Sequence, residues 1–208
     1  MLQRSGDIGA VALLCGGGSR RMGSDKAMIV FEGMALIERQ ANNIRQTLPE
    51  VPILICAGNH RFAALGNEDV NYVQDTEQDA GPLGGLSAAL ASAKYVETRA
   101  SHVLALPVDS LLLPSEVITA LLSVACHPEG AVVLKSHRLH PLHGLFPLSA
   151  ADAMGRYITS GRRNVMPFLE TLDWREACVP ADWEPCLNFN SPEEYASACR
   201  AFPNLSDL

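Results

Sequence analysis

The chain has 208 residues, of which 48% are hydrophobic and 19% are charged, a composition that suits one globular domain with a substantial core. Its formal net charge of −7 does not attract polyanions, so we do not expect nucleic acid as a partner. No apolar run reaches the length that spans a bilayer, and Asp7 lies directly before the short N-terminal apolar run. We therefore expect no membrane association and no secretory signal.

Short apolar runs alternate with longer segments of helical pattern up to about residue 136. The runs rich in Val, Ile and Leu are predicted strands: residues 10–15, 51–57, 70–73, 102–108 and 131–135. The segments of helical pattern are predicted helices: residues 34–48, 82–96, 114–126, 149–160, 164–172 and 192–202. Strands that are apolar throughout and separated by helices indicate a parallel sheet covered on both faces.

The cysteines are spread through the chain, at positions 15, 56, 126, 178, 186 and 199. No pair forms C-x-x-C, and no spacing matches that of a zinc knuckle. We therefore expect reduced, mostly packed thiols in a cytoplasmic protein.

The loop after the first predicted strand reads LLCGGGSRRMGSDKAM (residues 13–28) and combines glycines with cations. Gly16, Gly17 and Gly18 allow backbone N–H groups to approach a ligand closely. Arg21 and Lys26 add positive charge just beyond them. In an open sheet, ligands bind off the carboxyl ends of the strands, where this loop lies. These features indicate an anionic ligand, and a phosphate chain fits them best.

Two common phosphate-binding patterns do not fit this loop. A Walker A loop has lysine directly after its second glycine, whereas Ser24 and Asp25 follow Gly23 here. A dinucleotide-binding fingerprint has its third glycine where Arg21 stands. The pattern G-G-x-S-x-R-M-G-x-D-K does fit, and it is the signature of sugar-1-phosphate and related nucleotidyltransferases.

Within that group the chain resembles the bacterial molybdenum cofactor guanylyltransferases over nearly its whole length. The shared motifs are LLCGGGSRRMGSDKA (13–27), QDTEQDAGPLGGL (74–86), LALPVDSLLLP (104–114), HPLHGLF (140–146), GRRNVMPFLETL (161–172) and LNFNSPEEY (187–195). The fifth and sixth are specific to this family. Two residues depart from the pattern, because Cys15 replaces an alanine and Cys56 stands where such enzymes often have an asparagine.

The resemblance implies an α/β protein with a Rossmann-like three-layer nucleotidyltransferase fold and a mostly parallel central sheet. It implies one domain over residues 1–208, with a nucleotide-binding half at about 8–135 and an acceptor-substrate half at about 136–202. The implied reaction transfers GMP from GTP to molybdopterin, with Mg²⁺ as cofactor, and releases pyrophosphate. Cofactor-delivery proteins and molybdoenzymes are the implied protein partners.

The implied catalytic residues are Lys26, Arg21 and Asp109. Positioning and charge dominate such a reaction, because the attacking phosphate is already an anion. The two cations would stabilise the departing pyrophosphate, and Asp109 would hold Mg²⁺. Asp109 lies five residues before Pro114, too far to cap the helix predicted there.

The implied GTP-binding residues lie in the first half: Leu14, Cys15, Gly16, Gly17, Gly18, Lys26, Asp75 and Asp109. The alternative for Asp75 is a turn former in its loop. Gly81, Gly84 and Gly85 either offer N–H groups to the base or ribose, or permit close packing against the sheet.

The implied acceptor-binding residues lie in the second half: His140, Pro141, Arg162, Arg163, Asn188 and Asn190. The arginine pair is expected near the pterin phosphate, with a solvated helix end as the alternative. The asparagines, on a strand-like segment, either cap turns or contact the second substrate. A zinc site at His137, His140 and His143 is disfavoured, because a proline separates them and no cysteine is near.

Two other functions remain open from the sequence. A cytidylyltransferase would use the same fold and chemistry on molybdopterin or on a sugar or alcohol phosphate. A catalytically idle protein would bind nucleotide or pterin and deliver the cofactor. The presence of both Lys26 and Asp109 argues against the idle protein.

Overall fold

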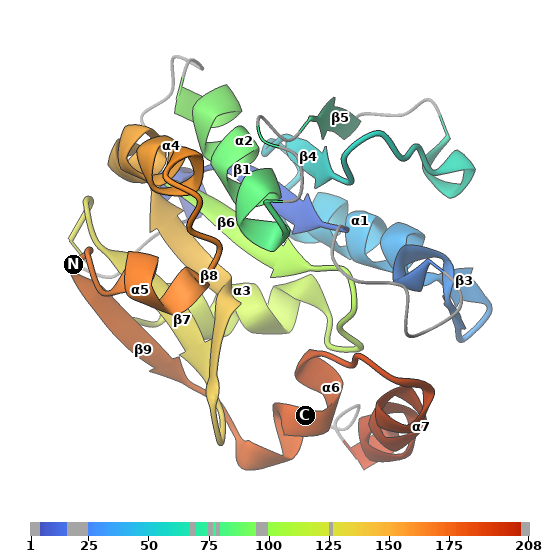
Figure 1. The fold of residues 1–208 in the computed structure, drawn as a ribbon. Coiled ribbons are helices and arrows are strands. Elements are labelled where there is room, and N and C mark those ends of the chain that lie inside the picture. Colours follow the sequence, from blue (N-terminus) through green and yellow to red (C-terminus); the bar gives the residue numbers. More distant parts are fainter. Residues whose placement is uncertain are drawn as a thin grey trace.

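A central sheet with the strand order β5-β4-β1-β6-β8-β7-β9 organises the part of the chain that the structure describes (Figure 1). The structure is a computed structural model and describes residues 5–15, 25–66, 70–74, 77, 80–94, 100–124 and 127–204. The strands are β1 (Ile8–Leu14), β4 (Ile53–Cys56), β5 (Val70–Val73), β6 (His102–Pro107), β7 (Ala131–Lys135), β8 (Leu139–Pro147) and β9 (Trp174–Cys178).

The sheet is mostly parallel, as predicted. β1 pairs in parallel with both β4 and β6, β4 with β5, and β7 with β9. β8 lies between β6 and β7 and runs antiparallel to both. The start of β8 therefore lies at the same edge of the sheet as the carboxyl ends of the other strands.

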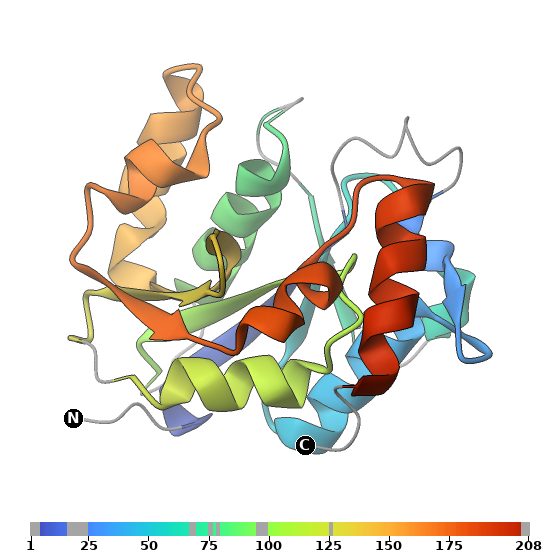
Figure 2. The ribbon, with the colours of Figure 1, turned by 90° about the horizontal axis from the view of Figure 1, so that it is seen from below.

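Helices cover both faces of the sheet and give three layers (Figure 2). One hydrophobic cluster packs α2, α4 and α5 against the sheet, and the other packs α1, α3, α6 and α7. The helices are α1 (Leu36–Thr47), α2 (Pro82–Lys94), α3 (Pro114–Leu122), α4 (Ala151–Thr159), α5 (Val165–Leu169), α6 (Glu184–Leu187) and α7 (Pro192–Ala201). None of the helices in the described ranges is both long and apolar enough to cross a membrane.

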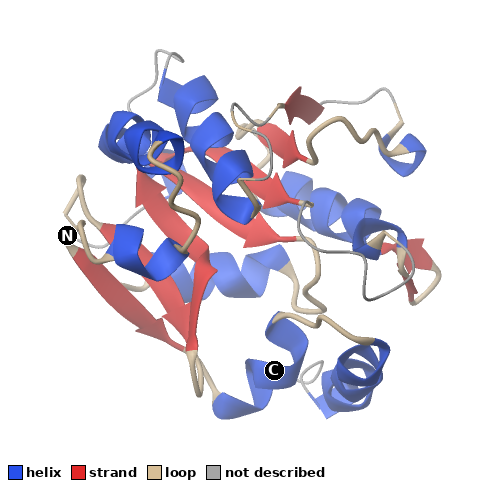
Figure 3. Ribbon diagram, in the orientation of Figure 1, coloured by secondary structure: helices blue, strands red, loops and turns tan. Residues whose placement is uncertain are grey.

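The described ranges also contain 3-10 helices and a short hairpin. The 3-10 helices are η1 (Ser5–Asp7), η3 (Lys26–Met28), η4 (Ala63–Leu65), η5 (Leu148–Ala150), η6 (Ala181–Trp183) and η7 (Phe202–Asn204). A two-stranded hairpin joins β2 (Val30–Phe31) to β3 (Met34–Ala35), and Figure 3 shows it apart from the central sheet.

The side chains of β1 show why the sheet needs cover on both faces. Val11 and Leu13 belong to the cluster under α1 and α3, whereas Ala12 and Leu14 belong to the cluster under α2. None of these side chains is more than 5% exposed. Burial of one large aliphatic side chain contributes roughly 1.5–3 kcal/mol, so this strand is firmly held in the core.

Within the central sheet, the structure adds two strands that the sequence did not predict, β8 and β9. β8 reads LHPLHGLFP, and its histidines and prolines interrupt the apolar pattern on which strand prediction depends. β9 reads WREAC and is an edge strand in which only Ala177 is buried. The strand-like segment expected around Asn188 and Asn190 is a loop between α6 and α7.

Candidate functional site

An open cavity of about 370 Å³ lies at the carboxyl ends of β1 and β6, beside the start of β8. Eight of the residues predicted from the sequence line it: Leu14, Cys15, Lys26, Asp109, His140, Pro141, Asn188 and Asn190. The structure thus brings residues of both predicted halves, nucleotide-binding and acceptor-binding, into one site.

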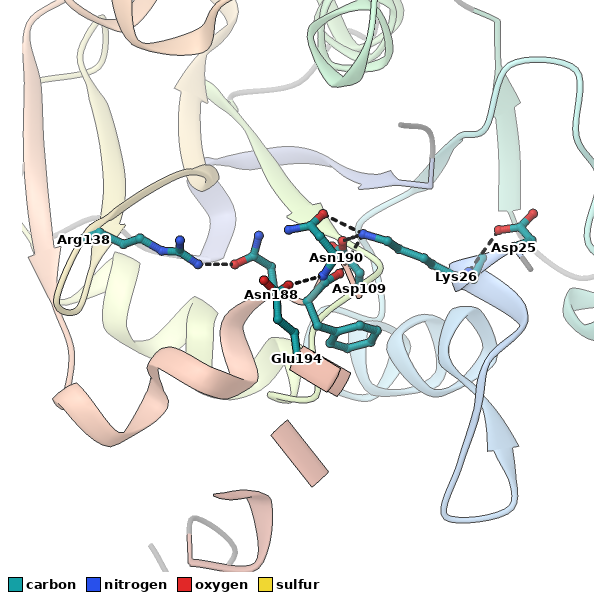
Figure 4. A network of polar contacts seen from close by, with 9 residues as sticks. Asp25, Lys26, Asp109, Arg138, Asn188, Asn190 and Glu194 are labelled. Atoms are coloured by element: carbon teal, nitrogen blue, oxygen red, sulfur yellow. Dashed lines mark hydrogen bonds and ion pairs between the residues drawn. The ribbon is translucent and has the colours of Figure 1, made fainter. Parts of the chain in front are cut away.

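At one end of the cavity, the ammonium group of Lys26 is held by three oxygen atoms (Figure 4). Nζ donates to Asp109 Oδ2 at 2.7 Å, to the Phe189 carbonyl at 2.7 Å and to Asn190 Oδ1 at 2.9 Å. A lysine ammonium has three N–H donors, so all of them are used. Lys26 is only 7% exposed, and these contacts compensate the burial of its charge.

Hydrogen bonds of neighbouring residues hold both members of the Lys26–Asp109 pair in place. Asp25 caps η3, because its Oδ1 accepts a hydrogen bond from the Ala27 amide at 3.0 Å. Ala27 is fully buried, which anchors the turn that carries Lys26. After β6, the buried amide of Gln40 on α1 donates to the Ser110 carbonyl at 2.7 Å and so holds the loop that carries Asp109.

The third part of this cluster comes from the loop between α6 and α7. Phe189 is fully buried, with its ring centroid 4.9 Å from that of Tyr195, and its carbonyl is therefore held in place. The Asn190 amide donates to Glu194 Oε2 at 2.5 Å. Ser191, and not an asparagine, caps α7 by accepting from the Glu194 amide. The Asn190 side chain is thus used by Lys26 and not by a cap.

Cys15, the first departure from the family pattern, lines the cavity as a neutral thiol. Burial raises the pKa of its thiol well above the usual value, and Cys56, Asp25 and Asp109 raise it further. Its Sγ donates weakly to the Leu13 carbonyl at 3.5 Å. This residue therefore supplies shape and not a thiolate.

Cys56, the second departure, packs beneath α2 and is not among the residues that line the cavity. Its Sγ donates to the Gly85 carbonyl at 3.3 Å. A Cβ added at Gly85 would lie 2.7 Å from the Cys56 Cβ, closer than two such atoms approach. Of the two alternatives for Gly85, close packing against the sheet therefore has direct structural support.

A bulge in β8 shapes the other end of the cavity. The pairing with β7 moves from Val133 opposite Gly144 to Leu134 opposite His140, so residues 141–143 bulge out of the ladder. Bulges re-aim side chains and recur beside active sites. Here both His140 and His143 line the cavity, with ring centroids 6.0 Å apart.

His143 is neutral in this setting. It is 2% exposed, and burial together with neighbouring His140 lowers its pKa to about 3. Among the described residues, no group lies within hydrogen-bond distance of its Nε2. An unsatisfied buried polar atom is destabilising in the free protein.

Glu184, at the start of α6, ties together the residues of the β7–β8 turn. Its carboxylate accepts from the Ser136 hydroxyl, contacts His140 Nε2 at 3.1 Å and pairs with Arg138 Nε at 2.6 Å. Burial alone would raise the pKa of Glu184, but these hydrogen bonds and the charge of Arg138 lower it to about 2. Arg138 Nη2 in turn donates to Asn188 Oδ1 at 3.1 Å (Figure 4).

Arg162 and Arg163, two of the acceptor-binding residues implied by the resemblance, are not among the residues that line the cavity. The Arg162 guanidinium lies 5.4 Å from the centroid of the Tyr157 ring and lines a separate hollow beside α4. Arg163 donates to the Ile158 carbonyl at the end of α4. These contacts match the alternative of a helix end.

Several predicted residues lie outside the described ranges: Gly16, Gly17, Gly18, Arg21 and Asp75. Conversely, the sequence motifs did not indicate Arg138 and Glu184, and they gave His143 no role in substrate binding. Arg138 stands two residues before the HPLHGLF motif, which was a usable signal. Glu184 carried no such signal, since only tertiary structure brings it into contact with Arg138 and His140, which line the cavity.

A mostly parallel sheet with a lysine–aspartate pair at the carboxyl ends of β1 and β6 defines the class of protein, a Rossmann-like nucleotidyltransferase. A solved structure with this fold is the molybdopterin-guanine dinucleotide biosynthesis protein A of Archaeoglobus fulgidus. Its TM-score is 0.67 at 22% identity, with 96% of this chain and 100% of that chain covered. This likeness shows the shared fold.

The chain belongs to the MobA-like NTP transferase family, whose domain matches residues 11–175. It is 29% identical to the molybdenum cofactor guanylyltransferase of Sinorhizobium fredii, with 100% of this chain and 99% of that protein covered. It is 31% identical to the protein of the same name from Rhizobium meliloti, with 94% and 92% covered. The family resemblance read from the motifs is confirmed.

Proposed function

We propose that this protein transfers GMP from GTP to the phosphate group of molybdopterin and releases pyrophosphate. The observation that carries the proposal is the Lys26–Asp109 pair at the carboxyl edge of the sheet, in a chain whose relatives are named guanylyltransferases. The protein would act in the cytoplasm, and molybdoenzymes or delivery proteins would receive the product.

In the proposed reaction, an oxygen of the acceptor phosphate forms a bond to the α-phosphorus of GTP. The bond from the α-phosphorus to the oxygen of the pyrophosphate group breaks, and pyrophosphate leaves with that electron pair. The attacking group is already anionic, so the protein contributes orientation and charge stabilisation. This matches a cavity that holds cations and amides and whose one thiol stays protonated.

The bonding of Lys26 constrains how it takes part. Its three N–H donors all have protein acceptors, so contact with a phosphate oxygen requires that one acceptor be exchanged. The Phe189 carbonyl is fixed by the buried Phe189 side chain. We propose that the Asp109 contact is the one exchanged, which leaves the lysine free to follow the charge of the departing pyrophosphate.

Asp109 is the residue that would hold Mg²⁺. Its carboxylate fits this hard cation, because Mg²⁺ is commonly bound through one or two carboxylates together with substrate phosphates, and Asp109 lines the cavity. When bound, Mg²⁺ would neutralise negative charge on the phosphate oxygens.

The proposal also gives roles to residues outside the described ranges. The backbone amides of Gly16, Gly17 and Gly18 and the side chain of Arg21 would contact the triphosphate. Asp75 would contact the nucleotide. The signature that includes the glycines and Arg21 supports the first of these assignments.

The test measures release of pyrophosphate from GTP, CTP and ATP, each with molybdopterin and Mg²⁺ and each repeated with a chelator. We expect turnover with GTP at least about tenfold above the other nucleotides, and loss of turnover with the chelator. Higher turnover with CTP than with GTP would mean that the protein is a cytidylyltransferase and not a guanylyltransferase. Binding of GTP and molybdopterin without turnover would favour the idle delivery protein.

A further inference from the structure

Among the described residues, Arg138 is the arginine that lines the cavity, at the end away from the Lys26 cluster (Figure 4). It lies in the turn between β7 and β8, where the Ser136 amide donates to its carbonyl at 3.1 Å. The antiparallel course of β8 brings this turn to the carboxyl edge of the sheet. The residue is therefore positioned by the fold and not by a flexible surface loop.

Two oxygen atoms hold the Arg138 guanidinium in one orientation. Nε contacts Glu184 Oε1 at 2.6 Å, and Nη2 donates to Asn188 Oδ1 at 3.1 Å. A guanidinium has five N–H donors, so three remain beyond these contacts with described residues. Its side chain is 64% exposed, which leaves that part of the fork open to the cavity. An open guanidinium fork matches the geometry of a phosphate group.

Glu184 is itself held by groups other than Arg138. The Ser136 hydroxyl and His140 Nε2 both contact its Oε2. The carboxylate is only 19% exposed and does not reorient freely. Glu184 of α6 therefore holds Arg138 from a fixed position, because it is itself hydrogen-bonded to the β7–β8 turn and to β8.

The loop between α6 and α7 links the two ends of the cavity. Asn188 contacts Arg138, and Asn190, two residues on, contacts Lys26. Phe189 between them is fully buried. This short rigid segment fixes the spacing between a cation at the nucleotide end and a cation at the other end, as a reaction between two phosphate-bearing substrates requires.

We propose that Arg138 binds the phosphate monoester of the acceptor substrate, and that Glu184 and Asn188 are the positioning residues that orient its guanidinium. This inference rests on the proposed function, which supplies the acceptor. It assigns the acceptor's phosphate to Arg138 and not to the pair Arg162 and Arg163, which lie outside the cavity.

The test compares Arg138→Gln and Arg138→Lys with wild type, using separate titrations of GTP and molybdopterin. We expect Arg138→Gln to raise the KM for molybdopterin roughly ten- to hundredfold and to change the KM for GTP less than about twofold. Arg138→Lys keeps the positive charge but lacks the planar guanidinium group. We expect its KM for molybdopterin to lie between those of wild type and Arg138→Gln. Arg175→Gln is the matched control, because Arg175 also pairs with a carboxylate, is 58% exposed and does not line the cavity.

Glu184→Gln separates positioning from a general structural role. A positioning role predicts a rise in the KM for molybdopterin alone, and no further rise when Glu184→Gln is added to Arg138→Gln. Thermal unfolding of each variant checks that the protein is folded. A structural role would instead lower stability and change the KM for both substrates.

The outcomes separate this inference from the proposed function. If the wild-type protein transfers GMP to molybdopterin and the Arg138→Gln variant has an unchanged KM for molybdopterin, the inference is overturned and the proposed function stands. A rise in the GTP KM of that variant, with the acceptor KM unchanged, assigns Arg138 to the nucleotide phosphates and also overturns it. A wild-type protein that transfers no nucleotide to molybdopterin overturns the proposed function, and the acceptor assignment with it.

Discussion

The two ends of the cavity hold their cations in different ways. Lys26 is 7% exposed, and all three of its donors contact protein oxygens. The Arg138 side chain is 64% exposed and keeps most of its donors beyond its contacts with described residues. A buried cation whose N–H donors are all used must give up one partner before it contacts a ligand. An exposed cation that is held in place and has unused N–H donors can contact a ligand directly. The Lys26 end of the cavity is thus closed by its own hydrogen bonds, and the Arg138 end is open.

The largest expected effect is at the carboxylate of the closed end. Asp109→Asn keeps the shape and an oxygen acceptor for Lys26 but removes the negative charge. We expect kcat/KM to fall about a thousandfold while GTP binding is partly retained, measured by pyrophosphate release and by calorimetry. Glu176→Gln is the control, because Glu176 pairs with Lys135 at 2.6 Å on the surface. Full activity of Asp109→Asn would refute the proposed role of this carboxylate.

Removal of the buried cation is the next largest change. Lys26→Met should lower kcat/KM about a hundredfold, because the charge on pyrophosphate loses a partner. Calorimetry should show a greater loss of affinity for GTP than for GMP, since only GTP carries the additional phosphates. Lys94→Met is the control, because Lys94 makes an ion pair of the same length, 2.7 Å, with Asp152. Equal losses for GTP and GMP would contradict the phosphate role of Lys26.

The two asparagines between α6 and α7 test whether the ends act separately. Asn190→Ala should raise the KM for GTP roughly tenfold, and Asn188→Ala should raise the KM for molybdopterin by a similar factor. Steady-state kinetics with each substrate varied in turn gives both values. If both variants raise the KM for the same substrate, the division of the cavity into two ends is wrong.

The smallest expected effect is on stability, at His143. Its pKa is lowered from 6.5 to about 3 in the folded protein, so the unfolded chain takes up a proton first as the pH falls. Folding stability attributable to this group is present above pH 6.5 and is lost toward pH 3, at about 1.4 kcal/mol per pH unit at most.

His143→Leu removes that titration and the unpaired Nε2 together. We expect the variant to be more stable by about 1 kcal/mol at neutral pH, and by more as the pH falls. Urea unfolding at a series of pH values measures both quantities. Equal acid sensitivity of variant and wild type would show that His143 does not remain neutral in the folded state.

The sequence predicted the closed end of the cavity better than the open end. Lys26 and Asp109 follow strands with unbroken apolar patterns, and the signature around Lys26 is local in the chain. Parallel strands meet at one edge, so two such residues were expected together. Their direct contact was not predictable, because it depends on the Phe189 carbonyl and Asn190, which are more than 160 residues from Lys26 in the chain.

The open end depends on features that local patterns do not encode. A strand that reads LHPLHGLFP gives no clear periodicity, and neither its reversal nor its bulge follows from composition. The basic pair at Arg162 and Arg163 was conspicuous in the sequence, yet those side chains lie against the end of α4. The arginine that lines the cavity among the described residues is Arg138, in a turn, and it pairs with Glu184 of the distant helix α6.

The reversal of β8 has a consequence for how such enzymes diversify. A reversed strand is joined to its neighbour by a short turn, and here that turn carries Arg138 to the rim of the cavity. Turns tolerate insertion and substitution far better than buried strands do. The residues that line this side of the cavity can therefore change within a few positions of one turn, while the buried strands beside it stay intact.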